Sequence, residues 1–186
     1  MSIDQLRPLV RRLATRASER AYNWMLNGAR TSADLLDAMP ILASPYAQSV
    51  AILSSDWYQG QDEDSRFSAQ MYDDLDPRKL ANIADWVFSG PQLPESRARV
   101  AAHRLVFDAA RRTVFVNAAE EGVAIARHES ATECTRCRQA ATTSVRHRGL
   151  GSGDVDQDFH PMCEGLFVPV RKDVWTPPDY ALKWAT

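Results

Sequence analysis

The chain has 186 residues, of which 45% are hydrophobic and 25% are charged, and its formal net charge is −2. This length fits one domain, or a helical domain with a small appended module, and the hydrophobic content argues against a disordered chain. The slightly negative charge excludes the strongly basic proteins that coat nucleic acid. The sequence has neither a run of about 18 apolar residues nor the apolar core of a secretory signal, so we expect no membrane span and synthesis in a reducing cytoplasm.

The first part of the sequence predicts two helices. Apolar residues spaced about 3.6 apart predict a helix over about residues 3–38, and Gly28 and Thr31 leave open a division of this segment into two. Pro40 then breaks the pattern. A second helix is predicted at 45–58, with its proline in the first turn.

Residues 56–76 carry seven acidic side chains and one basic side chain. Such a run of like charge is typical of a solvated segment. We therefore expect an exposed, mobile connection between the helices on either side of it.

Two further helices are predicted at 77–89 and 94–121. Asp76 and Pro77 have the residue types of a helix start, and Gly122 that of a helix end. We expect the longer helix to direct five arginines to solvent, namely Arg97, Arg99, Arg104, Arg111 and Arg112.

The character of the sequence changes after this helix. Residues 123–128 and 165–170 predict two short strands that pair with each other. The predicted fold is therefore α+β and mostly α-helical, with a helical region at 1–121 and a small module at 122–174. The aromatic residues of the tail at 175–186 predict that it docks onto the body.

All three cysteines lie in this module, beside one histidine. The spacing is Cys134-x2-Cys137, then twenty-two residues, then His160-x2-Cys163. A tetrahedral zinc ion needs four sulfur or nitrogen ligands, and two short paired motifs can supply them from two directions. Because four protein ligands leave no position for a catalytic water, the predicted zinc is structural. It would brace a segment that has few apolar residues of its own.

Other interpretations of the cysteines stay open at this point. They can be reduced thiols without a metal, or the first pair can be a redox motif, although no βαβ pattern surrounds it. His128 lies six residues before Cys134 and is a reserve ligand.

The order of these motifs resembles a known family. The chain carries Ala109-Ala-Arg-Arg-Thr113, then Cys134-x-x-Cys137-Arg138, Phe159-His160-Pro-x-Cys163 and Val168-Pro-Val170. This arrangement is similar to the Mu F-like head morphogenesis (minor capsid) proteins of tailed bacteriophages, in the form common among actinobacterial phages. The resemblance covers about the last hundred residues. One position differs, because family members often have a cysteine where this chain has Gly165.

The resemblance implies a protein present in few copies in the virion, at the portal and the capsid interior, and in the host cytoplasm during assembly. Its partners would be portal and capsid proteins during head assembly and DNA packaging, and its zinc ligands would be the four residues above. Related phage proteins are often labelled capsid maturation proteases. The available residues, Ser144, Ser152, His103, His128 and His147, lie in no G-x-S-x-G elbow, so we expect binding rather than catalysis.

A nucleic-acid-binding zinc module is the other alternative. Five arginines lie between residues 122 and 153, against two glutamates. Guanidinium groups bind phosphate without regard to sequence, but three nearby aspartates at 154–158 can neutralise the same patch. The candidate contacts to DNA or to a protein partner are Arg127, Arg136, Arg138, Arg146 and Arg148.

Overall fold

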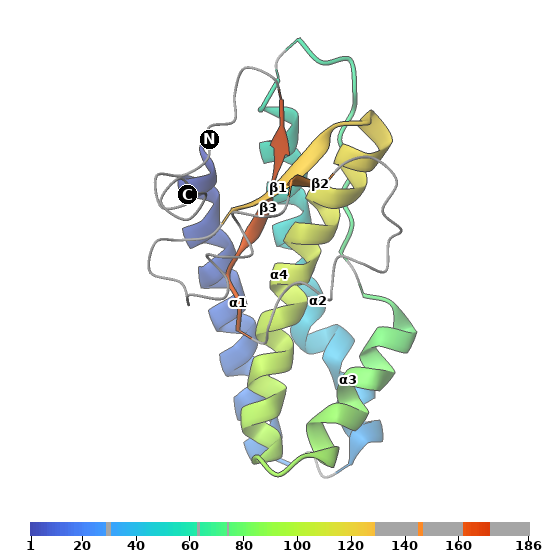
Figure 1. The fold of residues 1–186 in the computed structure, drawn as a ribbon. Helices are drawn as coiled ribbons and strands as arrows, with labels where there is room; N and C mark the ends of the chain where they lie inside the picture. Colours follow the sequence, from blue (N-terminus) through green and yellow to red (C-terminus); the bar gives the residue numbers. More distant parts are fainter. Residues whose placement is uncertain (29–30, 63, 74, 129–144, 147–161, 172–186) are drawn as a thin grey trace, which may run out of the picture.

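In a computed structural model of the chain, four helices surround a common core, and a small sheet covers one end of them (Figure 1). The structure describes residues 1–28, 31–62, 64–73, 75–128, 145–146 and 162–171. The helices are α1 (Ile3–Leu26), α2 (Ser32–Gln59), α3 (Pro77–Ser89) and α4 (Pro94–Glu121). The strands are β1 (Ala124–His128), β2 (Val145–Arg146) and β3 (Leu166–Val170). The predicted class, α+β and mostly helical, is confirmed.

The bounds of the first two helices differ in part from the prediction. α1 ends at Leu26, and α2 begins where Thr31 and Asp34 form a reciprocal capping box. The division near Gly28 and Thr31 that the sequence left open is therefore confirmed. α2 then continues through Pro40 and Pro45, so the helix end at residue 38 and the break before residue 45 are wrong. The reason is that both prolines lie on the exposed side of α2, where water can solvate the carbonyls that lose a donor.

α3 and α4 have the bounds that the sequence predicts. Asp76 caps α3, and Gly122 ends α4 in the left-handed conformation, with φ of 77°. α4 is the central helix, because α1, α2, α3 and both longer strands pack against it (Figure 1). Buried alanines on α1 and α4 are small enough to allow a close approach of neighbouring helices. They include Ala14, Ala17 and Ala21 on α1 and Ala98, Ala101 and Ala102 on α4, all at most 4% exposed.

Because α4 is central, two of the five arginines that were expected to face solvent are buried. Arg111 is 1% exposed and Arg97 is 6% exposed. The Arg97 guanidinium lies 4.1 Å from the ring centroid of Trp86 on α3. It also fills the space beside Gly90, where any added Cβ would collide with it. Ala-rich sequence around these arginines looked like a solvent face because alanine is compatible with both exposed and buried helix positions.

The connection between α2 and α3 is held along α4 by side chains that pair with its backbone. The Asn117 side chain accepts from Gln70 N at 2.7 Å and donates to Gln70 O at 2.7 Å. Thr113 Oγ1 accepts from Tyr72 N at 3.1 Å and donates to Tyr72 O at 3.0 Å. Thr113 and Asn117 are four residues apart on the helix, and they bind two residues that are two positions apart in the extended connection. These hydrogen bonds hold residues 70–72 against α4, and several side chains of the connection are exposed, as expected.

The three strands form an antiparallel sheet in the order β2-β1-β3. The predicted pairing of the two longer strands is confirmed, with Ala126 opposite Val168. The two-residue strand β2 was not predicted. Ile125, Leu166 and Phe167 belong to the same buried cluster as the helices, so β1 and β3 share the helical core. Among the described residues, no helix has the length and apolar character needed to cross a membrane.

Asn117→Ala should lower the free energy of unfolding by about 1–3 kcal/mol, because two hydrogen bonds to the connection are lost from a buried position. Urea unfolding measures this change, and amide exchange at Gln70 should become faster. The matched control is Gln70→Ala, which keeps the backbone groups that Asn117 binds. An equal loss in both variants would contradict the assigned role of the Asn117 side chain.

Candidate functional site

The described part of the predicted zinc site is Cys163, at the turn that leads into β3. Cys134, Cys137 and His160 lie outside the described residues, as do Arg136, Arg138 and Arg148. Arg146 is described by its backbone alone, in β2. Of the predicted site residues, the structure therefore brings Arg127 and Cys163 together and leaves the rest of the predicted set untested.

Cys163 is buried, with 2% of its surface exposed, and its sulfur receives two N–H donors. Gly165 N lies 3.4 Å from Sγ, and an Arg127 guanidinium nitrogen lies 3.3 Å from it. The turn begins at Met162, whose φ of 65° is uncommon for a residue with a side chain. Donors directed at a sulfur, one of them cationic, stabilise the thiolate, which is the form that binds a metal. Within the described residues, this environment fits one ligand of the predicted zinc site.

The backbone of this turn is fixed by Arg111 of α4. Its Nε donates to Gly165 O at 2.9 Å, and a terminal nitrogen donates to Cys163 O at 2.6 Å. Its other terminal nitrogen donates to Asp108 Oδ1 at 2.8 Å. The guanidinium therefore joins the long helix to the two carbonyls on either side of Glu164. We call Arg111, Asp108 and these two carbonyls the Arg111 clamp.

Asp108 supplies the charge that balances this arginine inside the core. It is 1% exposed and also contacts Lys79 Nζ at 3.0 Å and Arg104 Nε at 3.4 Å. Burial alone would raise the pKa of Asp108, but the charges of Lys79, Arg111 and Arg104 hold it below its ordinary value. The carboxylate is thus ionised at neutral pH.

Glu164, between the two clamped carbonyls, ties the turn to α1 and to the first half of α4. Its carboxylate pairs with the Arg11 guanidinium and lies 3.7 Å from His103 Nε2. His103 is 3% exposed and stacks on Phe107, with 4.9 Å between the ring centroids. Residues 163–165 of the turn are therefore all held by arginines of the helices, because Arg111 binds Cys163 and Gly165 and Arg11 binds Glu164.

His128, the reserve ligand, is engaged with the first turns of α1. Arg7 lies against His128 Nδ1 and donates to His128 O at 3.1 Å. Burial first, and then the charge of Arg7, lowers the pKa of His128 to about 4. The ring is therefore neutral at physiological pH, and Arg7 occupies one of its two nitrogens. Its service as a zinc ligand stays a prediction.

Arg127 does not have the exposure that a phosphate contact needs. It is 3% exposed and directs its guanidinium to Cys163. This burial does not fit the expected surface contact of Arg127 with DNA or a protein partner. The sequence placed it in a basic patch, whereas the inward-facing register of β1 places it in the core.

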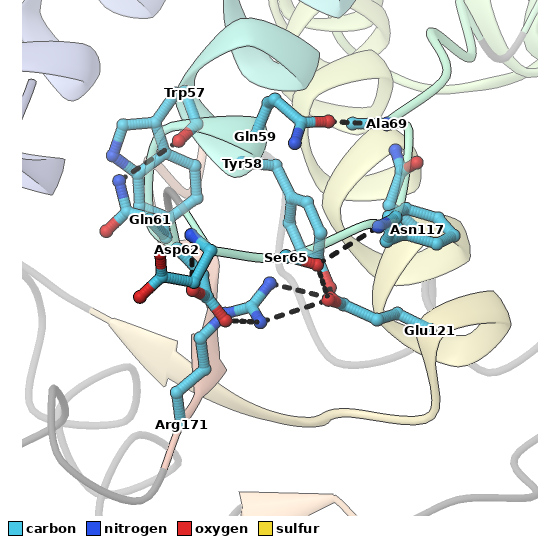
Figure 2. Close-up of polar contacts among 12 residues, drawn as sticks. Trp57, Tyr58, Gln59, Gln61, Asp62, Ser65, Ala69, Asn117, Glu121 and Arg171 are labelled. Atoms are coloured by element: carbon cyan, nitrogen blue, oxygen red, sulfur yellow. Dashed lines mark hydrogen bonds and ion pairs between the residues drawn. The ribbon is translucent and has the colours of Figure 1, made fainter.

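A second polar cluster holds the other end of β3 against the helices (Figure 2). Glu121, at the end of α4, accepts from Tyr58 OH at 2.6 Å, from Ser65 Oγ at 2.7 Å and from Arg171 at 2.6 Å. Arg171 also donates to Asp62 at 2.9 Å. Burial would raise the pKa of Glu121, but the hydrogen bonds from Arg171, Tyr58 and Ser65 outweigh it and hold the pKa below its ordinary value. We call these five residues the Glu121 cluster.

Sequence reasoning missed the residues that position the turn. Asp108 and Arg111 are three residues apart in a run that is otherwise mostly apolar, and a pair of opposite charges at this spacing was the available signal. Of the serine and histidine residues considered for proteolysis, the structure describes His103 and His128. Each is occupied by the contacts given above.

The chain was compared with known proteins. The sequence model of a family described as VG15 protein matches residues 2–185. Neither the curated proteins nor the solved structures contain a significant match.

Glu121→Gln should reduce the dependence of stability on pH below neutrality. The pKa of Glu121 is lower in the folded protein than in the unfolded chain. The stability that its ionised carboxylate contributes is therefore full above the ordinary carboxyl pKa, and it is lost as pH falls through the lowered folded pKa. In the wild type, the free energy of unfolding should therefore decline over this acidic range, and the variant should decline less steeply. Urea unfolding at a series of pH values measures it. Glu19→Gln, on the exposed side of α1, is the control and should keep the wild-type slope.

Proposed function

The chain belongs to the VG15 protein family, a phage-associated family, and we propose on this basis that it is a minor head protein of a tailed phage. In this proposal it acts by binding, without catalysis, at the portal and the capsid interior while the head assembles and DNA is packaged. Its location would be the virion, after synthesis in the host cytoplasm. The family match supports the phage assignment, and the resemblance of the C-terminal motifs supports the head.

The environment of Cys163 is the observation that carries the mechanistic part of the proposal. A buried sulfur that receives two N–H donors, on a turn fixed by the Arg111 clamp, is suited to hold a metal and to keep its own position. A rigid first half of such a site lowers the entropy lost when the remaining ligands close around the ion.

We propose that Cys134, Cys137, His160 and Cys163 hold one structural zinc ion. The ion would supply a cross-link between the segment around residues 134–137 and the clamped turn before β3. Because four ligands of these types complete a tetrahedral shell, the ion would have no role in hydrolysis. The protein would then present the segment between the two ligand pairs as a fixed binding surface.

Arg138, Arg146 and Arg148 belong to this segment, and Arg136 lies next to it, within the first ligand pair. They are suited to an acidic protein surface or to the phosphates of packaged DNA. Arg127 is left out of this set because it is buried.

The protein should be found in purified, nuclease-treated virions by quantitative mass spectrometry, at a small number of copies relative to the major capsid protein. Heads assembled without the protein should be defective in number or in DNA content. Detection in the infected-cell lysate but not in the purified particles would contradict the proposed location.

The purified protein should contain about one zinc per chain by elemental analysis, and Cys163→Ser should lower this content by at least tenfold, since one of four ligands is lost. Chelation should also lower the thermal midpoint of the wild type. A matched control is Ser144→Ala, which removes a hydroxyl from the same segment and no predicted ligand. A zinc content near zero in wild-type protein prepared without chelator would exclude the proposed site.

A further inference from the structure

The outer side of α2 differs from the outer sides of the other helices in its lack of charge. α2 packs against α1, α3 and α4 with one side, and it lies behind α4 in the view of Figure 1. Between Asp37 and Asp56 it has eighteen residues, and none of them is charged. A helix that is apolar or uncharged all round is normally covered by another part of a protein.

Exposed residues on this side follow a helical spacing. Ile41 is 66% exposed and Ile52 is 48% exposed. Pro45 and Gln48 lie between them and are also exposed. Steps of four, three and four residues place all four on one line along the helix. We call Ile41, Pro45, Gln48 and Ile52 the α2 stripe.

The prolines make this side receptive to hydrogen-bond donors. Pro45 has no N–H, so the carbonyl of Ile41 on the same stripe lacks the i+4 donor that a helix normally supplies. Pro40 leaves the carbonyl of Leu36 in the same condition. The stripe therefore combines exposed apolar carbon with backbone acceptors.

The charges at its two ends indicate what kind of partner fits. Asp34 and Asp37 lie at the N-terminal end of the same line, and Asp56 lies at the C-terminal end, all three exposed. Two copies of the stripe, parallel or antiparallel, would place aspartate against aspartate, which disfavours a homodimer. The same acids would be repelled by an anionic membrane surface.

We propose that the α2 stripe binds a helix of another head protein whose contact face is apolar and whose two ends carry lysine or arginine. Asp37 and Asp56 are nineteen residues apart, which is about 28 Å along a helix. The basic groups of the partner helix should have a similar separation. This inference rests on the proposed role as a head protein that acts by binding, and it assigns that role a surface and a partner chemistry.

The test uses two synthetic helical peptides that share one Leu/Ala face. One has lysines at both ends, about nineteen residues apart, and the other has glutamates at the same positions. Binding of each fluorescent peptide to the full chain is followed by anisotropy at low salt. The wild type should bind the lysine-ended peptide at least tenfold more tightly, and high salt should reduce the difference.

Variants separate the stripe from other exposed apolar residues. Ile41→Asp with Ile52→Asp should weaken binding of the lysine-ended peptide at least tenfold. Leu26→Asp with Leu93→Asp, which changes two residues of similar exposure elsewhere, should leave it unchanged. Asp37→Lys with Asp56→Lys should reverse the preference between the peptides, and Asp34 is kept because it caps α2. Thermal unfolding of each variant establishes that it is folded.

Equal affinity for the two peptides, or no binding of either by the wild type, would overturn the inference. A dimer in sedimentation that the Ile41→Asp, Ile52→Asp variant dissolves would also overturn it, because a second copy would then be the occupant. These results are independent of the virion measurement. If the protein is absent from particles but still prefers the lysine-ended peptide, only the head-protein role is refuted. If it is present in particles but shows no preference between the peptides, only the role of the α2 stripe is refuted.

Discussion

The guanidinium of Arg111 connects the helical core to the turn that carries Cys163, and the position of β3 depends on this connection. A fully buried arginine loses its hydration, and this loss is offset only when its nitrogens find acceptors and its charge finds a partner. Here Asp108 supplies the charge, and the carbonyls of Cys163 and Gly165 supply the remaining acceptors. Any displacement of the turn would leave the guanidinium with unpaired donors, so the helix and the strand constrain each other.

α4 applies the same principle along the rest of its length. Thr113 and Asn117 bind the backbone of the connection between α2 and α3, and Glu121 gathers Arg171, Tyr58 and Ser65 at the end of the helix. These polar side chains lie about one turn apart. Each one fixes a segment that has no regular hydrogen bonding of its own with α4. A buried central helix thereby organises the irregular parts of the chain as well as the other helices.

The elements that were predicted correctly are those whose signals are local. Asp76 and Pro77 start α3, Gly122 stops α4, and short apolar runs mark the two longer strands. The break at Pro40 and the helix start at residue 45 were wrong, because proline is a strong local signal for a helix break, whereas α2 tolerates both prolines on its exposed side.

The candidate site was less predictable, because burial of a charged residue depends on contacts far away in the sequence. Arg111 looked like a surface arginine until the carbonyls of residues 163 and 165, more than fifty positions later, were placed against it. Arg127 looked like part of a basic patch for a similar reason. The spacing of the cysteines and histidine predicts Cys163 as a zinc ligand, which stays a prediction, and the two N–H donors at its sulfur have no signal in that spacing.

The Arg111 clamp also bears on how the protein forms on the ribosome. The helices leave the exit tunnel before residues 163–165 do, so a nascent four-helix intermediate contains the ion pair of Arg111 and Asp108 without the two carbonyl acceptors. In that state water can bind the guanidinium in place of the two carbonyls, and this water is displaced when the turn packs against α4. Burial of Arg111, and with it completion of the core, therefore waits for synthesis of the turn.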